Sequence, residues 1–396
     1  MVRSRKEAEN KSSSDRAVKG KLADEKFAKE WKPPTFTLKQ IRDCVPAHCF
    51  KRDTLKSLSH VVVDAAMASA LFYGALHIRY LDLQLQPMAW AAYWFAQGVV
   101  CTGLWVLAHE CGHSAFSDYS IVNNSVGFIL HTALLVPYFS WKYTHSKHHK
   151  GTNNLEKDQV FVPPSRRRVE RHYKMPLSGS VDPLYSGESL FEDAPLYNVV
   201  QVVFMLLLGW PLYILKNVTS QKHKQWVSHF FPNAPIFDAR EYYGVVYSNI
   251  GIAMMLGVLG SLIYKFGGLA VFAYYGIPYL FVNMWLVLIT YLQHTDPTVP
   301  KYRGKEWDFM RGALGTVDRD FGILNYFFHH ITDTHVVHHL FSTMPFYHAQ
   351  EATAAVKEFL GPYYLFDSKP FYEAVFDCNA TCKFVEDEGD IVWFKH

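Results

Sequence analysis

The sequence has little charge and few cysteines for its length. Charged residues make up 19% of the 396 residues, and the net charge is +3, whereas about one quarter of an ordinary globular domain is charged. So small a net charge, without a basic stripe carrying interleaved aromatic residues, predicts no nucleic-acid partner. Six cysteines, of which only Cys378 and Cys382 are closely spaced, exclude a disulfide scaffold.

The first 30 residues have no long apolar run. They are rich in lysine, glutamate and serine, a composition typical of a solvated, disordered segment. A secretory signal peptide contains an apolar stretch of about 7–15 residues, so we expect the N-terminus to stay in the cytosol. The sequence predicts a disordered cytosolic tail over residues 1–35 and one membrane domain over residues 36–396.

Hydrophobic residues make up 49% of the chain, and they gather in long runs. A helix needs about 20 apolar residues to cross a hydrocarbon core of about 30 Å. A shorter run, at 126–141, contains His131 and Pro137 and predicts an interfacial or re-entrant helix. The runs together indicate an all-α integral membrane protein. The five long runs lie at 61–80, 88–108, 196–215, 247–264 and 269–293.

The distribution of lysine and arginine predicts the orientation in the membrane. Residues 1–58 are rich in both, whereas the turn at 81–87 has neither, so the second helix returns to the cytosol. Gly209-Trp210-Pro211 interrupts the run at 196–215, and a basic segment follows it, so this helix is not expected to cross. We therefore predict four spanning helices (near 61–80, 88–108, 247–264 and 269–293), one or two interfacial or re-entrant helices (near 126–141 and 196–215), and a histidine-rich cytosolic cap.

Histidine is in excess, with 20 residues, and eight of them form three motifs. The motifs read HECGH at 109–113, HSKHH at 145–149 and HVVHH at 335–339. Spacings of three and four place imidazoles on one face of a helix, where they can converge on a metal ion. Adjacent side chains point about 100° apart, so the doublets HH suit a site with two metals. With His294 at the end of the last run, the candidate ligands are His109, His113, His145, His148, His149, His294, His335, His338 and His339.

The remaining histidines are assigned ordinary roles, among them His48, His60 and His348; His329 and His330 are weaker ligand candidates. HECGH also matches the H-E-x-x-H motif of zinc proteases, and a metal transporter or a bis-histidine haem would also use histidines. Nine imidazoles exceed what one zinc binds, and they lie past the ends of the apolar runs rather than within them. Two metals with open coordination positions favour iron that activates O₂. Such a pair beside membrane helices would oxidise a C–H bond in lipid.

The motifs and the text around them are similar to the membrane fatty-acid desaturases, in particular the endoplasmic-reticulum acyl-lipid Δ12/ω3 group. The similarity runs from about residue 36 nearly to the C-terminus. It includes PAHCF at 46–50, LLVPYFSWKYTHSKHH at 134–149, DQVFVP at 158–163, RGALGTVDRDFG at 311–322 and ITDTHVVHHLFSTMPFYHAQEAT at 331–353.

The resemblance implies a di-iron centre held by the nine histidines, His294 included. It implies that O₂ and two electrons remove two hydrogens from a phospholipid acyl chain, with oleoyl becoming linoleoyl in Δ12 members. The HPGG motif of a fused cytochrome b5 is absent, so a separate cytochrome b5 and its NADH-dependent reductase are expected as partners. The resemblance also implies a multi-pass protein of the endoplasmic reticulum with both termini cytosolic, and it leaves room for a homodimer.

Two features bear on specificity. Glu110 in the first motif is usual in Δ12 members, whereas Ser114 departs from plant Δ12 sequences, so ω3, bifunctional Δ12/ω3 and acyl-hydroxylase activities stay open. A kinked apolar tunnel must present one C–H bond to the metals. The candidate tunnel residues are Thr102, Leu104, Trp105, Phe341 and Met344.

Overall fold

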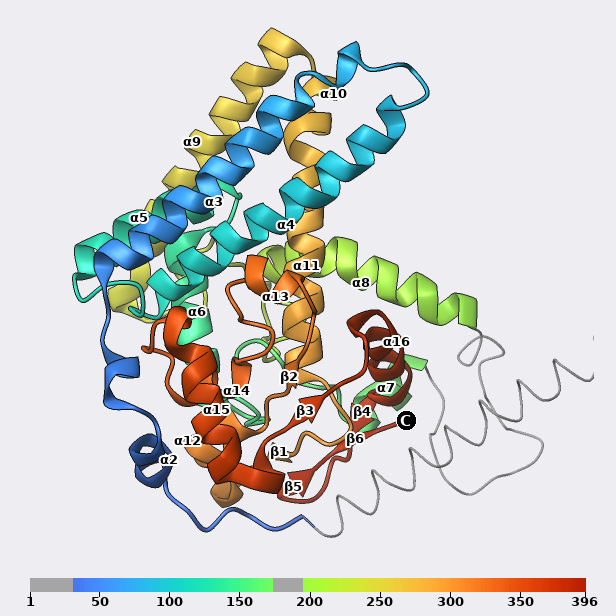
Figure 1. The fold of residues 1–396 in the computed structure, drawn as a ribbon. Helices are drawn as coiled ribbons and strands as arrows, with labels where there is room; N and C mark the ends of the chain where they lie inside the picture. Colours follow the sequence, from blue (N-terminus) through green and yellow to red (C-terminus); the bar gives the residue numbers. More distant parts are fainter. Residues whose placement is uncertain (1–30, 174–194) are drawn as a thin grey trace, which may run out of the picture.

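The computed structural model describes residues 31–173 and 195–396 (Figure 1). Most of the predicted tail at 1–35 lies outside the described residues. Long helices project from a compact cap, and both the first described residues and the C-terminus lie on the cap side (Figure 1). The projecting helices are α3 (Thr54–Ala75), α4 (Gln86–Gly112), α9 (Tyr242–Phe266) and the α10–α11 segment, which continues from α10 (Gly268–Val271) through the π-helix η4 (Phe272–Gly276) into α11 (Ile277–His294).

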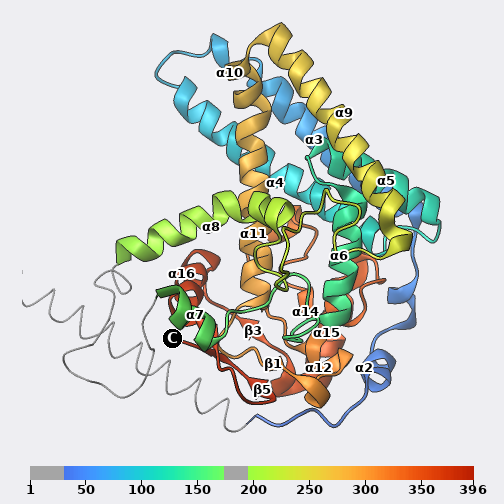
Figure 2. The same ribbon diagram turned by 180° about the vertical axis from the view of Figure 1, so that it is seen from behind.

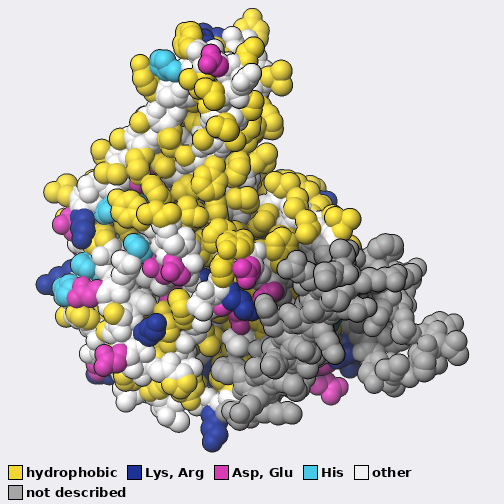
Figure 3. All heavy atoms as spheres, turned by 45° about the vertical axis from the view of Figure 1, so that its right-hand side comes forward, with side chains coloured by type: hydrophobic (Ala, Val, Ile, Leu, Met, Phe, Trp, Pro, Cys, Tyr) yellow, Lys and Arg dark blue, Asp and Glu magenta, His cyan; other side chains and the backbone are white. Residues whose placement is uncertain are grey.

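The outward faces of the projecting helices are apolar. Val62 and Tyr73 on α3 and Met254 and Leu269 on α9 and α10 are largely exposed, and hydrophobic side chains cover this part of the surface, whereas most charged ones lie on the cap (Figure 3). So large an exposed apolar surface marks contact with lipid. By length and composition, five helices of the described residues could cross a membrane, which confirms the multi-pass membrane fold.

The fifth of these helices is α8 (Pro195–Lys216), which continues through Pro211. It lies across α11 rather than alongside it (Figures 1 and 2). By length and composition α8 could cross the membrane as well, so its placement at the membrane surface stays a prediction.

The interfacial or re-entrant helix predicted at 126–141 is a bent pair of helices, as in a broken span or a re-entrant loop. Two helices, α5 (Ser120–Ala133) and α6 (Tyr138–Gly151), meet at a bend of 109°. The chain turns because Leu135 adopts a positive φ of 55°, and Pro137 follows, which fixes φ and lacks an N–H. Gly127 permits the turn to close, since a Cβ there would lie 2.4 Å from the Tyr138 ring. The second histidine motif therefore lies within α6 rather than after the predicted helix.

The cap is mostly helical, but the expectation of an all-α protein misses three small sheets. Each sheet has two strands of two residues, too short to show an alternating pattern in the sequence. The strands pair as β1 (Lys301–Tyr302) with β5 (Ile391–Val392), β2 (Asp318–Arg319) with β3 (Phe366–Asp367), and β4 (Phe384–Val385) with β6 (Phe394–Lys395); only the β2–β3 pair is parallel. The helices of the cap are α7 (Arg166–Tyr173), α12 (Phe309–Leu314), α13 (Leu324–Phe327), α14 (His335–Leu340), α15 (Ala349–Leu360) and α16 (Phe371–Thr381).

The segment before the first long helix runs down the outside of the cap. It contains α2 (Leu38–Cys44) and the 3₁₀ helix η1 (Ala47–Phe50), and it packs against α15 (Figure 1). Ile41, Val45 and Cys49 of this segment share one hydrophobic core with Val336 and Val337 of α14. The packing of this segment therefore supports the helix that carries the third histidine motif.

Candidate metal centre

Four helices bring the nine candidate histidines together where the long helices meet the cap. The first motif ends α4, the second lies on α6, the third on α14, and His294 is the last residue of α11. Most of the nine side chains are buried; His113 and His145 are partly buried. The histidines form two groups with no shared member.

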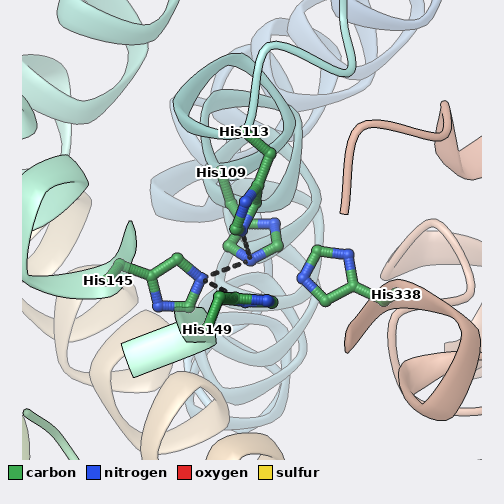
Figure 4. Close-up of side chains that lie close together, drawn as sticks. All are labelled: His109, His113, His145, His149 and His338. Carbon is green, nitrogen blue, oxygen red and sulfur yellow. Dashed lines mark hydrogen bonds between the residues drawn. The ribbon is translucent and has the colours of Figure 1, made fainter. Parts of the chain in front are cut away.

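The first group contains five imidazoles. Its ligand atoms all lie within 4.8 Å of one another, and the rings converge on one centre (Figure 4). The His109 Nε2 atom lies 2.9 Å from His145 Nε2 and 3.2 Å from His113 Nε2, and His145 Nε2 lies 3.2 Å from His149 Nε2. The group consists of His109, His113, His145, His149 and His338.

The second group contains four imidazoles around His294. The ligand atoms of His148, His294 and His339 lie within 4.8 Å of one another. His294 Nε2 lies 3.1 Å from His335 Nε2 and 3.4 Å from His148 Nε2. The doublets are divided between the groups, because the angle between adjacent helical side chains turns His148 away from His149 and His339 away from His338.

The residues present fit metal ions better than hydrogen bonds among themselves. A neutral imidazole has one N–H, so five ring nitrogens that face one point cannot all be paired. Protonation does not solve this, because burial and neighbouring imidazoles hold the pKa values of His335, His338 and His339 well below the usual range. Nitrogens bound to one ion at about 2.1 Å at right angles lie about 3.0 Å apart, close to the spacings in both groups.

The outer nitrogens of two rings are held by neighbouring groups. His148 Nδ1 lies 2.7 Å from Asp158 Oδ1, and His339 Nδ1 lies 3.1 Å from the Thr152 hydroxyl. With its proton on Nδ1, His148 presents the lone pair of Nε2 to the second group. The histidine spacing did not reveal these partners, although Asp158 opens the DQVFVP segment.

The Asp158→Asn variant is expected to bind metal about 10–100-fold more weakly, the usual cost of losing such an outer partner. The asparagine side chain keeps an oxygen that can accept hydrogen bonds from the backbone N–H groups of Val160 and Phe161, as Asp158 does. It loses the negative charge that orients His148. Metal retention during dialysis against increasing chelator measures the effect. Asp320→Asn is the control, since Asp320 accepts from Gly322 N and the Asn325 amide and from no imidazole; equal retention by both variants would contradict the prediction.

The five candidate tunnel residues do not all lie beside the first group of imidazoles. The Trp105 ring stacks on His109 with a centroid distance of 5.8 Å, whereas the buried Thr102 hydroxyl donates to Gly98 O within its own helix. Phe341 and Met344 line a cavity of about 10 Å³ that also borders Glu110 and His338. Leu104 is partly buried on α4. Three of the five therefore border the first group, and a role in substrate binding stays a prediction for all of them.

A further buried pair was not anticipated from the sequence. His329 Nε2 lies 2.7 Å from Asp64 Oδ2, and both side chains are buried. Gly103 of α4 leaves room for the pair, since a Cβ there would lie 3.0 Å from Asp64 Oδ2. An acidic residue inside an apolar helix was the available signal. His329 and His330 belong to neither group of imidazoles.

The described residues thus define a multi-pass helical membrane protein with two all-histidine groups, each able to hold a metal ion, at one end of its helix bundle. A family model described as fatty acid desaturase matches residues 88–370. The chain therefore belongs to the fatty acid desaturase family and is an oxidoreductase. A second model, a domain of unknown function (DUF3474), matches residues 1–72.

Individual relatives match almost the whole chain. A Delta(12) fatty acid desaturase of Mortierella isabellina is 50% identical over 93% of this chain and 93% of its own length. A Delta(12)-oleate desaturase of Trichosanthes kirilowii is 46% identical over 92% of this chain and 96% of its own. An acyl-lipid (9+3)-(E)-desaturase of Dimorphotheca sinuata is 43% identical over 92% and 93%.

The family also decides how HECGH is used. His109 and His113 belong to the group of five imidazoles. Glu110 accepts a hydrogen bond from the Phe346 N–H through Oε2. Glu110 Oε1 lies 3.5 Å from His109 Nδ1 and 3.9 Å from His338 Nδ1. The Glu110 carboxylate thus contacts two imidazoles of this group and a backbone N–H, and the family match favours a desaturase over the zinc-protease and transporter alternatives.

Proposed function

We propose that the protein is a Δ12 acyl-lipid desaturase that converts oleoyl chains of membrane phospholipids into linoleoyl chains. The observation that carries the proposal is the division of nine imidazoles into two groups at the ends of apolar helices, in a chain 50% identical to a Delta(12) fatty acid desaturase. The nine histidines are the proposed ligands of two iron ions, and a metal pair with imidazole ligands and open positions suits O₂ chemistry.

The reaction balances with O₂, two electrons and two protons. Two neighbouring methylenes each lose one hydrogen, a C=C bond forms, and O₂ leaves as two water molecules. Bound iron would supply the oxidation, and the protein's part is to hold the acyl chain so that one C–H bond faces the metals. Trp105, Phe341 and Met344 border the first group from the side of α4 and the cap, which supports their role in this positioning.

The proposed electron donor is a separate cytochrome b5, reduced by its NADH-dependent reductase. The proposed location is the endoplasmic-reticulum membrane, with both termini and the cap in the cytosol. The basic segment that follows the second motif and the lysine-free turn at 81–87 support this orientation. A donor that docks from the cytosol would then meet the face of the protein that carries the metal groups.

Expression in a host without polyunsaturated lipids, followed by fatty-acid profiling, tests the activity. Linoleate in the phospholipids is expected, and a host lacking cytochrome b5 should produce much less. Trienoic acids would show an ω3 or bifunctional enzyme, and hydroxylated oleate a hydroxylase, because relatives this similar carry different activities in their names. An unchanged profile despite abundant folded protein in the membrane would contradict the proposal.

A further inference from the structure

A third cluster of metal-binding side chains lies outside both groups of imidazoles. It joins η1 to the start of α15 and to the 3₁₀ helix before it, η6 (Phe346–His348). His48 and Cys49 come from η1, His348 ends η6, and Glu351 lies in the first turn of α15. Their ligand atoms all lie within 4.8 Å of one another, although about 300 residues separate the two halves of the cluster along the chain.

The contacts in this cluster are close and mixed in chemistry. His48 Nε2 lies 2.9 Å from Glu351 Oε2 and 3.7 Å from Cys49 Sγ. The rings of His48 and His348 lie 5.4 Å apart at 77°. The side chains of His48 and Glu351 are 53% and 51% exposed, whereas Cys49 is fully buried. The imidazole of His48 and the carboxylate of Glu351 are therefore open to an ion from solvent, whereas the Cys49 thiol beside them is shielded from solvent.

One thiolate, two imidazoles and one carboxylate make a four-donor set of the kind that zinc binds in tetrahedral sites. An exposed contact between a histidine and a glutamate contributes little to stability. Such a contact alone does not explain why Cys49 and His348 lie beside it. In the metal-free protein, burial and the charge of Glu351 raise the pKa of the Cys49 thiol to about 11. A bound cation reverses this effect, because it stabilises the thiolate directly.

We propose that His48, Cys49, His348 and Glu351 form a zinc-binding site that clips the segment before the first membrane helix to α15. The clip shares no ligand with the two histidine groups. Cys49 belongs to the same hydrophobic core as Val336 and Val337 of α14, so the clip holds the layer that backs the third histidine motif. Its role is structural, since all four positions of the ion are filled by protein.

Metal analysis of the full chain, purified in detergent, tests the clip. We expect about one zinc per chain in addition to any iron, in keeping with one four-donor site. Replacement of that zinc by cobalt should produce the thiolate-to-cobalt charge-transfer absorption and the visible bands of a tetrahedral ion. Cys49→Ser should lose the zinc and the charge-transfer absorption, and chelator should then lower its unfolding temperature by less than that of the unaltered protein, since a bound ligand stabilises only the state that binds it.

Cys44→Ser is the matched control. Cys44 lies on α2, and its thiol contacts Ala355 O of α15, so it also joins this segment to α15 without belonging to the cluster. Glu351→Gln and His348→Gln alter exposed or partly exposed side chains and serve if Cys49→Ser does not fold; both should weaken zinc binding at least tenfold. Zinc content unaffected by these variants, or cobalt spectra without the thiolate absorption, would overturn the clip. Iron content is measured in the same samples, so failure of the clip is distinguished from failure of the proposed di-iron centre.

Discussion

Replacement of His294 by alanine is expected to abolish desaturation and to lower the iron content from two ions to about one per chain. His294 is the centre of the second group, with its Nε2 atom within 3.1–3.4 Å of the Nε2 atoms of His335 and His148, and it has no part in the first group. Loss of an outer partner of a metal ligand already costs about 10–100-fold. Loss of the ligand itself should therefore reduce turnover by more than about 100-fold, below detection in a lipid profile.

Iron analysis and fatty-acid profiling of the same preparations measure this effect. His77→Ala is the control, because His77 also follows a membrane helix, but among the described residues it hydrogen-bonds to Tyr73 O through Nδ1 and belongs to neither group. His77→Ala should keep two irons and full activity. A His294→Ala protein that keeps both irons, or that still forms linoleate, would show that the second group is not a metal site.

The candidate site was predictable from the sequence because its signal is local. Spacings of three and four residues on a helix determine which imidazoles share a face, and adjacent positions in HH cannot share one. The structure accordingly places His148 and His149 in different groups, and likewise His338 and His339. The five apolar runs were equally visible, since a helix able to cross a membrane leaves a long composition signal in the chain.

The features missed depend on contacts between distant segments. The bend between α5 and α6 depends on Leu135 in a left-handed conformation and on Gly127 under the Tyr138 ring, and neither requirement has a distinctive sequence pattern. The pair of Asp64 and His329 spans 265 positions. Asp64 alone gives a signal, as an acidic residue in an apolar helix, but only the fold shows that its partner is His329.

The C-terminal end of α11, where His294 lies, is held by one buried arginine. Arg319 has a side chain only 1% exposed; its Nε donates to Leu292 O at 2.9 Å and one terminal nitrogen to Asp296 Oδ2 at 2.8 Å. The other terminal nitrogen forms an ion pair with Asp367 of β3. The guanidinium thus ties together the end of a membrane helix, the loop after it and a strand of the cap.

Arg319→Met is expected to lower the free energy of unfolding by about 3–5 kcal/mol, because it leaves the mostly buried carboxylates of Asp296 and Asp367 without their ion-pair partner. Arg240→Met, which removes an exposed ion pair with Asp238, should change it by no more than about 0.5 kcal/mol. Thermal unfolding in detergent compares the two variants. Adding Asp367→Asn to Arg319→Met should recover part of the loss, since the cost arises from the unpaired charge rather than from lost packing. If the double variant is no more stable than Arg319→Met alone, Arg319 acts through its contact with Leu292 O and not as the ionic link between α11 and the cap.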